Sequence, residues 1–263
     1  MILDTRALFL RLLRTLEIAT VCDVGSMDGA DALRFRRALP RAAILALEPN
    51  PRNVALMQAD DGLARHAIAI LPFAAADRDG EAPLFVVDAD YAPGRDRFRR
   101  GMSSLHRRDG TQVADVVAVR TVRLDGLLRA QSLTSGPIAL WIDTEGMAFE
   151  AVAGAAGILG ATAMLHVEVE TQRCISPEQK LLEDVERLLG EAGFRLLATD
   201  QPRDALQLNA LFLRAESLAA KGPEIRRHAA RARARRGMKR AVQGLLPRRL
   251  RHLVPGVVET RVR

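Results

Sequence analysis

Acidic residues follow three short apolar segments of this chain, each inside a turn. The turns have the sequences DVGSMDG (residues 23–29), EPNP (48–51) and IDTEG (142–146). In a parallel sheet such turns meet at the carboxyl ends of the strands, where α/β proteins bind their ligands. Carboxylates at that edge can accept hydrogen bonds from ligand hydroxyls and balance a positive charge. The three turns therefore predict one site for a nucleotide-like cofactor.

The first turn distinguishes between cofactors. Gly25 permits a sharp turn after the strand, and Gly29 permits close approach of the next helix. A dinucleotide-binding motif needs a second glycine where Met27 stands, because the backbone there must approach a pyrophosphate. Asp28 would also repel phosphates. S-adenosylmethionine carries no phosphate, and its cationic sulfonium and amino groups suit Asp23 and Asp28. The turn favours S-adenosylmethionine over a nicotinamide dinucleotide.

Glu48 and the acids near residue 143 suggest separate roles. Glu48 lies 19 residues beyond Gly29, where a carboxylate can accept hydrogen bonds from both ribose hydroxyls of an adenosine. Asp143 and Glu145 are the first candidates to orient or deprotonate an acceptor. His166, on the next strand, is a weaker candidate that is more typical of a hydrogen-bonded core histidine.

The same acids raise the question of a metal. Asp143, Glu145 and Glu168 could form an oxygen-rich Mg²⁺ site, but no compact spacing demands one. Asp143 can also cap the helix that follows it. The expectation is a site without a metal.

Apolar periodicity predicts strands and helices in alternation. The pattern predicts an open, doubly wound α/β fold with a mostly parallel sheet and a terminal antiparallel hairpin. A capping box of Ser176 and Gln179, with Pro177 in the first turn, marks the helix 177–189. Strands are expected at 18–24, 43–47, 66–71, 80–87, 113–122, 137–142, 163–169, 194–199 and 206–213, and helices at 2–17, 30–39, 53–60, 124–130, 148–159 and 177–189.

Charge divides the chain into two parts. The whole sequence has 39 Lys and Arg against 32 Asp and Glu, a net charge of +7. Residues 215–263 hold 14 of the basic and 3 of the acidic residues, so the remainder is mildly acidic. We expect a domain over 1–214 with an N-terminal helix in 1–17, and a basic, helical or partly disordered tail over 215–263. The tail has no aromatic residue for stacking on bases, so no sequence-specific nucleic acid is expected.

Segment 222–256 combines basic residues with leucines, a pattern that can lie on an anionic membrane surface. Cys22 and Cys174 indicate two buried, reduced thiols rather than a disulfide framework. Charges interrupt the leucines of the first 19 residues, which argues against a signal peptide. The expected location is the cytoplasm, with possible attachment to the inner face of the membrane.

The loop 88–112 breaks the alternation of strands and helices. It carries six arginines, and a loop of this length is more often functional than idle. It could be a lid that recognises an anionic acceptor, or a solvated arginine-rich loop. The arginines are at positions 95, 97, 99, 100, 107 and 108.

Together these motifs resemble one family. DVGSMDG, LALEPNP (45–51), AAADRDG (74–80), SSL (103–105) and WIDTEGMAFEAVAGA (141–155) look like the FkbM family of S-adenosylmethionine-dependent methyltransferases. The resemblance covers about residues 20–170, and NALFL (209–213) fits the last strand. This chain has Met27 where the family commonly has Asn, and Trp141 where it commonly has Lys.

The resemblance implies a Rossmann-like class I methyltransferase fold and methyl transfer to a hydroxyl, on a glycan or glycolipid, or on a polyketide-type product. A non-catalytic binding module with the same fold is the remaining alternative. By the resemblance, Asp143, Glu145 and Gly146 lie beside the reacting centre, with His166 as a further catalytic candidate. The implied cofactor-binding residues are Asp23, Gly25, Ser26, Asp28, Gly29, Glu48, Asn50, Asp77 and Asp143.

Overall fold

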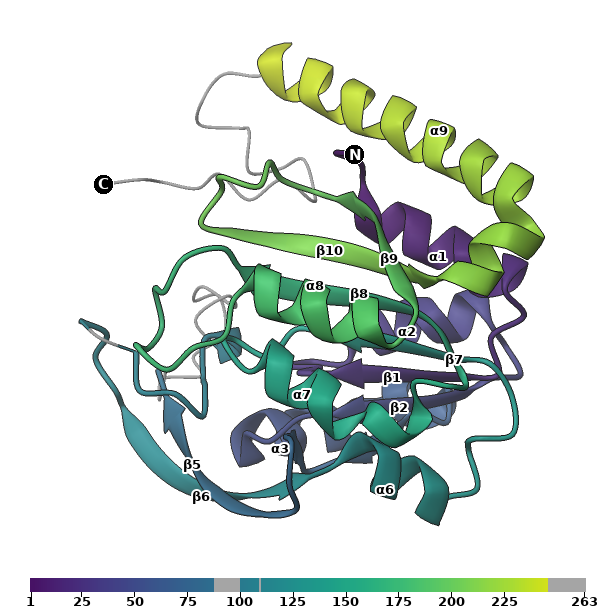
Figure 1. Ribbon diagram of the computed structural model, residues 1–263. Coiled ribbons are helices and arrows are strands. Elements are labelled where there is room, and N and C mark those ends of the chain that lie inside the picture. The colour runs from purple at the N-terminus through teal and green to yellow at the C-terminus, as the bar shows by residue number, and fades with distance from the viewer. Residues whose placement is uncertain (88–99, 109, 246–263) are drawn as a thin grey trace.

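A central sheet with helices on both faces forms the body of the protein (Figure 1). The computed structural model describes residues 1–87, 100–108 and 110–245. Within them the large sheet has seven strands, and its parallel part pairs β3 with β2, β2 with β1, β1 with β7 and β7 with β8. The strands, in spatial order, are β3 (Ala69–Leu71), β2 (Ala43–Leu47), β1 (Thr20–Val24), β7 (Ile138–Ile142), β8 (Thr162–Glu170), β10 (Gln207–Arg214) and β9 (Phe194–Thr199).

The order reverses between β1 and β7, which is where a doubly wound sheet binds its ligand. β10 runs antiparallel to both β8 and β9. The mostly parallel sheet and its terminal antiparallel hairpin are therefore confirmed.

Helices cover each face of the sheet and bury a separate apolar cluster. One face carries α1 (Thr5–Thr15), α2 (Ala30–Ala38), α3 (Pro51–Gln58) and α4 (Asp61–Arg65). The other carries α6 (Leu124–Ala130), α7 (Ala148–Gly154), the 3₁₀ turn Ala156–Ile158 and α8 (Leu182–Glu191). The helices cover both faces of the parallel strands, which explains why those strands read as continuous apolar runs.

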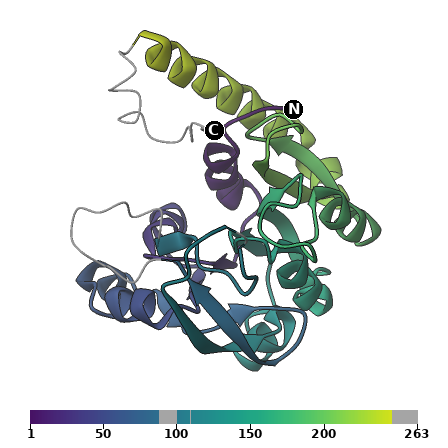
Figure 2. The ribbon, with the colours of Figure 1, turned by 90° about the vertical axis from the view of Figure 1, so that its left-hand side faces the viewer.

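A second, three-stranded sheet stands beside the carboxyl edge of the large one. It has the order β4 (Ala74–Ala75), β6 (Asp115–Val122) and β5 (Gly80–Val86). Figure 2 views the molecule from the left-hand side of Figure 1, with this small sheet at the bottom and α9 along the top. Residues 88–99 and 109 of the predicted lid lie outside the described residues.

The predicted start of the helix near residue 177 is wrong. The helix α8 begins at Leu182, where Asp184 Oδ2 accepts a hydrogen bond from the Leu181 backbone N–H. Gln179 is fully buried, and its Oε1 accepts bonds from the backbone N–H groups of Cys174 and Ile175. Gln179 thus stabilises a loop instead of capping a helix. Cys22 is buried as expected, but Cys174 is exposed.

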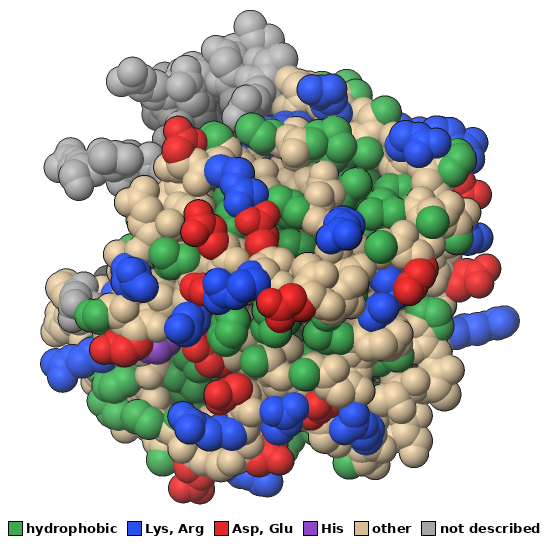
Figure 3. All heavy atoms as spheres, viewed as in Figure 1, with side chains coloured by type: hydrophobic (Ala, Val, Ile, Leu, Met, Phe, Trp, Pro, Cys, Tyr) green, Lys and Arg blue, Asp and Glu red, His purple; other side chains and the backbone are tan. Residues whose placement is uncertain are grey.

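The basic segment after β10 continues as a long helix, α9 (Ala215–Leu245). Ile225, Ala229 and Ala232 are buried against the cluster that α1 and α2 form. Lys221 departs from helical geometry two residues before Pro223, so the helix is kinked there. Figure 3 shows Lys and Arg side chains over α9, while the rest of this face mixes both signs. No helix among the described residues has the length and apolar character needed to cross a membrane.

Candidate active site

A pocket with about 540 Å³ of empty space opens where β1, β2 and β7 end. Gly25, Glu48 and Asp143 form its wall at these three strand ends. The small sheet adds Ala74 and Leu84, and Phe73 lies just before it; the described part of the predicted lid adds Arg100 and Ser103–Leu105. The sequence thus located the three strand ends correctly but did not single out Phe73.

Gly25 allows the turns after β1 and β7 to touch. Its φ is +83°, and a Cβ atom built on it would lie 1.8 Å from the Asp143 carbonyl oxygen. The backbone N–H groups of Gly25 and Ser26 both donate to the Leu47 carbonyl at 2.9 Å. The three turns are therefore held together by backbone contacts, and a side chain at position 25 would force them apart.

Asp23 supports the first turn from behind the pocket wall. It is buried, and its Oδ2 accepts hydrogen bonds from Ser26 Oγ at 2.6 Å and from the Ala32 backbone N–H at 3.1 Å. Burial, with a smaller contribution from nearby Asp31, raises the pKa of Asp23 to about 8. In this structure Asp23 fixes the turn to the start of α2 and does not line the pocket.

Glu48 connects the turns after β1 and β2. Its Oε2 accepts a hydrogen bond from the Met27 backbone N–H at 2.8 Å, and its Oε1 accepts one from the Asn50 N–H at 2.9 Å. Asn53 Nδ2 donates to the same Oε1 at 3.2 Å. Burial raises the pKa of Glu48, while these donors and Arg100 oppose the rise. The carboxylate is therefore fixed in position on the pocket wall.

Met27 occupies a conformation that is unfavourable for its side chain. Its φ is +54°, in the left-handed region, and its side chain lines the pocket. A residue other than glycine, asparagine or aspartate in this region costs about 1–2 kcal/mol. The hydrogen bond to Glu48 and the contact of Gly25 with Asp143 hold the turn in place despite this cost.

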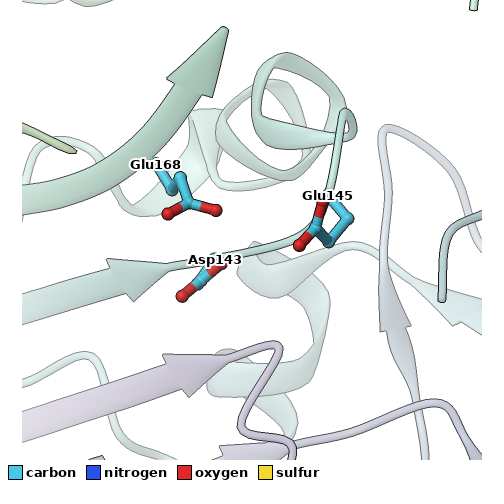
Figure 4. Close-up of side chains that lie close together, drawn as sticks. All are labelled: Asp143, Glu145 and Glu168. Carbon is cyan, nitrogen blue, oxygen red and sulfur yellow. The ribbon is translucent and has the colours of Figure 1, made fainter. Parts of the chain in front are cut away.

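Three carboxylates converge beside the pocket, as Figure 4 shows. One oxygen from each of Asp143, Glu145 and Glu168 lies within 4.8 Å of the other two. Burial, and then the negative charges of its two neighbours, raises the pKa of Glu168 well above its ordinary value. Burial also raises the pKa of Asp143, but the hydrogen bond with Glu168 opposes this rise. These opposed effects favour a proton on Glu168 over one on Asp143.

Arg108 stabilises the third carboxylate. Its guanidinium lies 2.5 Å from Glu145 Oε2, and both side chains are 18% exposed. Burial and Asp143 raise the pKa of Glu145 to about 7, whereas Arg108 lowers it. Glu145 therefore changes its ionisation near neutral pH, as a general base needs to do. From the sequence, Arg108 is only one of the six lid arginines, and no pattern predicts that it pairs with Glu145.

Residues 100–108, which we call the covering segment, lie against the pocket. Arg100 Nε donates to Asn53 Oδ1 at 3.3 Å, and Ser104 Oγ donates to the Glu145 carbonyl at 2.6 Å. Ser104 also pairs with Phe85 of the small sheet. The covering segment is thus attached to α3, to the turn after β7 and to the small sheet.

Two hydroxyl groups of the pocket are buried without a hydrogen-bond partner in the described part of the chain. They are Ser103 Oγ, on the covering segment, and Thr144 Oγ1, between the two acids of the β7 turn. A buried hydroxyl without a partner costs about 1–3 kcal/mol. A ligand with polar groups would satisfy them.

Several predicted site residues lie elsewhere. His166 is buried under α1, where its Nε2 pairs with Thr5 Oγ1 at 3.0 Å and its ring stacks on Trp141 at 3.6 Å. Because both rings lie in the core cluster of the α1 face, the structure does not bring His166 to the pocket. Asp77 has an exposed side chain next to Arg78 and is not part of the pocket wall.

The remaining predicted cofactor residues lie behind the wall. Asp28 Oδ1 accepts a bond from the Ala30 N–H at the start of α2, and Asn50 Oδ1 accepts one from the Arg52 N–H at the start of α3. Gly29 has a φ of +73°, and a Cβ there would lie 2.6 Å from Leu63. These residues shape the turns and begin the helices.

The carboxylates could also hold a divalent cation, because carboxylate oxygens are its preferred ligands. In the structure, Arg108 already supplies a positive charge to Glu145, and the raised pKa of Glu168 favours its neutral form. This arrangement reduces the negative charge of the cluster without an ion.

Sequence comparison connects this site to known proteins. Residues 23–196 match the family described as the methyltransferase FkbM domain. A curated relative, "2-O-methyltransferase NoeI" of Sinorhizobium fredii (strain NBRC 101917 / NGR234), is 25% identical over 156 residues. That match covers 58% of this chain and 63% of the relative, so the chain spans less than two thirds of the relative's length.

Solved structures give more distant similarities. A methyltransferase FkbM from Methylobacillus flagellatus KT has a TM-score of 0.44 and 14% identity, covering 75% of this chain and 44% of that one. A magnesium protoporphyrin IX methyltransferase (ChlM) from Synechocystis PCC 6803 with bound SAM has a TM-score of 0.42 and 13% identity. It covers 81% of this chain and 77% of that one.

Proposed function

Because the chain belongs to the FkbM methyltransferase family, we propose that it transfers the methyl group of S-adenosylmethionine to a hydroxyl of a glycan or glycolipid. The chain has the class I methyltransferase fold, with the strand order described above. Its dependence on S-adenosylmethionine is part of this proposal. The acceptor, and the roles of individual residues, are our proposal.

The pocket suits this cofactor in charge and shape. Gly25 leaves room beside the first turn, which a Cβ atom would fill. We assign Glu48 to the ribose hydroxyls and the apolar wall around Phe73 and Ala74 to the adenine. Asp23, Ser26, Gly29 and Asn50 would act indirectly, by holding these turns in place. The cofactor supplies an activated methyl group on a sulfonium, so the protein mainly has to align the acceptor.

Glu145 is our candidate for the general base, and Asp143 for orienting the acceptor. The acceptor hydroxyl would donate its proton to the Glu145 carboxylate while its oxygen forms the bond to the methyl carbon. The electron pair of the breaking carbon–sulfur bond stays on sulfur, and the products are a methyl ether and S-adenosylhomocysteine. A pKa of about 7 makes Glu145 a suitable base at neutral pH.

Two observations support a hydroxylated acceptor. The name of the curated relative specifies O-methylation. Ser103 Oγ and Thr144 Oγ1 are buried in the pocket wall without partners among the described residues, and an acceptor with several hydroxyls could bond both. The observation that carries the proposal is the position of Glu145, which lines the pocket between Asp143 and Arg108.

The test is methyl transfer to isolated acceptor fractions. Labelled S-adenosylmethionine would be incubated with polysaccharide, glycolipid and small-molecule fractions, followed by linkage analysis of the labelled product. Label in a methyl ether of a sugar is expected. Label confined to amino groups or carboxyl groups, or no transfer to any fraction, would reject the proposed acceptor class.

We also propose that the chain contacts an anionic membrane surface through 222–256. In the described part of this segment, Arg226, Arg227 and Arg231 are exposed on α9, and each base near a membrane contributes about 1 kcal/mol. Residues 246–256 lie outside the described residues. The division into a domain over 1–214 and a tail from 215 also remains a proposal, since the inner face of α9 packs on the domain.

A further inference from the structure

A groove between α1 and α9, separate from the active site, combines an apolar floor that includes Leu10 with several cationic side chains. It holds about 790 Å³ of empty space, part of which is open to solvent. α1 contributes Arg11, Arg14 and Thr15, and α9 contributes His228 and Arg235. The groove thus joins the N-terminal helix to the basic helix, two segments that are more than 200 residues apart in the sequence.

His228 lies at the centre of the positive charge. Its Nε2 pairs with Thr15 Oγ1 at 3.1 Å, while its buried Nδ1 has no partner in the part of the chain that the structure describes. Burial, followed by the charges of Arg11, Arg231 and Arg227, lowers the pKa of His228, and Glu224 alone opposes them among the named causes. These arginines repel a protonated His228, and an anion bound in the groove would offset that repulsion.

One acid pairs with a cation of the groove, and the other arginines of its lining outnumber it. Asp4 lies 3.6 Å from Arg235 and also caps α1 by accepting a bond from the Ala7 N–H. Arg14 donates through Nε to the Ala38 carbonyl, so its position is fixed by a neutral partner. The surplus of guanidinium groups favours a ligand with several anionic oxygens.

Exposed apolar side chains stand next to this basic region. Met238 is 69% exposed on α9, and Met1 is 57% exposed at the start of the chain. The first residues of the chain contact α9, because Arg236 donates to the Leu3 carbonyl and Arg235 pairs with Asp4. Basic residues beside exposed apolar ones are typical of surfaces that contact lipid.

We propose that the groove between α1 and α9 binds a phosphate group. Arg11 and Arg235 would contact its oxygens from opposite helices, and His228 would lie beside it. The inference is independent of methyl transfer and rests on the proposed membrane contact only for the source of the phosphate, which we expect to be the headgroup of an anionic lipid.

The first experiment tests the groove itself. The pKa of His228 would be measured by NMR in the full chain, with and without inorganic phosphate, and its signal assigned with His228→Gln. A bound anion favours the charged imidazole, so phosphate should raise the pKa of His228 by about 1. The same titration in Arg11→Gln/Arg235→Gln should show no such rise. An unchanged pKa in the wild-type chain would overturn the proposal.

The second experiment tests the source of the phosphate. Partitioning would be measured onto vesicles of phosphatidylglycerol with phosphatidylcholine, and onto phosphatidylcholine alone. Losing two bases at about 1 kcal/mol each should weaken binding to the anionic vesicles about 30-fold in Arg11→Gln/Arg235→Gln. The control Arg65→Gln/Arg78→Gln removes the same charge from exposed arginines away from the groove, and should lose less than about threefold.

The outcomes separate the proposals. The two double variants could lose vesicle binding equally while phosphate still raises the pKa of His228 in the wild-type chain. That result would keep the phosphate site but reject the lipid as its source. Binding of an RNA homopolymer that is lost only in Arg11→Gln/Arg235→Gln, with vesicle binding intact, would also reject the lipid source. Affinity for S-adenosylhomocysteine should be the same in all variants, so failure of the methyl-transfer proposal would leave this result unaffected.

Discussion

At the scale of single residues, Glu48 combines two tasks. It accepts backbone hydrogen bonds from Met27 and Asn50, and it faces the pocket where we place the ribose. A hydrogen bond to a charged group contributes about 1.5–3 kcal/mol. Loss of this carboxylate should therefore affect ligand binding and the geometry of two turns together.

We predict that Glu48→Ala weakens binding of S-adenosylhomocysteine at least tenfold, as measured by calorimetry. The matched control is Glu81→Ala, which removes the same group from an exposed position on β5. Thermal unfolding of both variants would show whether Glu48→Ala still folds. An affinity equal to that of the control would mean that the ribose does not lie against Glu48.

Glu145 should control the pH dependence of the reaction. A base acts only when it is ionised, so the rate should fall as the pH drops through about 7, the pKa of Glu145. Glu145→Gln should lower the rate about 10²–10⁴-fold and abolish this dependence. Arg108→Gln should move the midpoint to higher pH, because Arg108 lowers the pKa of Glu145. If the pH dependence of the rate is the same in Glu145→Gln as in the wild-type chain, another residue is the base.

The sequence indicated which carboxylates meet, but not what surrounds them. Strand-end acids can be located because parallel strands end at one edge. The pairing of Arg108 with Glu145 depends on how the covering segment folds back, for which spacing gives no rule. His166 was misleading for a related reason. It shares a face of β8 with Glu168, but it lies two residues before the strand-end acid and is covered by α1, where its ring stacks on Trp141.

At the scale of elements, the turn after β1 is the most constrained segment. It contains two glycines with positive φ, Gly25 and Gly29, and also Met27 at +54°. The glycines could be predicted from the sequence, because a sharp turn and a close approach both require them. The strain at Met27 could not be predicted, since a methionine at the equivalent position of another type of turn would not have a positive φ.

We predict that Met27→Asn increases the free energy of unfolding by about 1 kcal/mol, because asparagine tolerates the left-handed region. Urea denaturation would measure this change. Met27→Leu keeps both the apolar side chain and the strain, and should be close to neutral. Equal stability of the Asn and Leu variants would show that the turn relaxes without cost.

The start of α8 shows the limit of short motifs. Ser176, Pro177 and Gln179 form a good helix-start pattern, yet the helix begins at Leu182. The backbone N–H groups of Cys174 and Ile175 donate to Gln179 Oε1, so this side chain stabilises the loop and does not cap a helix. Such competition depends on a loop geometry that is set by tertiary packing, which local sequence does not encode.

At the scale of the whole molecule, alternation of strands and helices was enough to predict the sheet and its terminal hairpin. It could not show that the basic helix packs on the N-terminal one. Ala and Arg dominate α9, and its few apolar residues give a weak pattern. The buried stripe of Ile225, Ala229 and Ala232 is therefore visible only once α1 is in place.

We predict that Ile225→Ala lowers the free energy of unfolding by about 2–5 kcal/mol, the usual cost of truncating a buried isoleucine. Met238→Ala, on the same helix but 69% exposed, should change it by less than about 0.5 kcal/mol. Both values can be measured by urea denaturation. Similar small effects in the two variants would mean that α9 contributes little to the stability of the domain.

The contact of Gly25 with the Asp143 carbonyl has a consequence for how new specificities could arise. Since the donor side and the acceptor side of the pocket share this backbone junction, neither can be reshaped without displacing the other. The covering segment is joined differently. Each of its contacts with Asn53 and Glu145 involves a side chain, and its backbone pairs with Phe85 of the small sheet rather than with the turns after β1 and β7. Changes of acceptor should therefore accumulate in residues 100–108, and grafting this segment from a relative is the most direct way to redirect the enzyme.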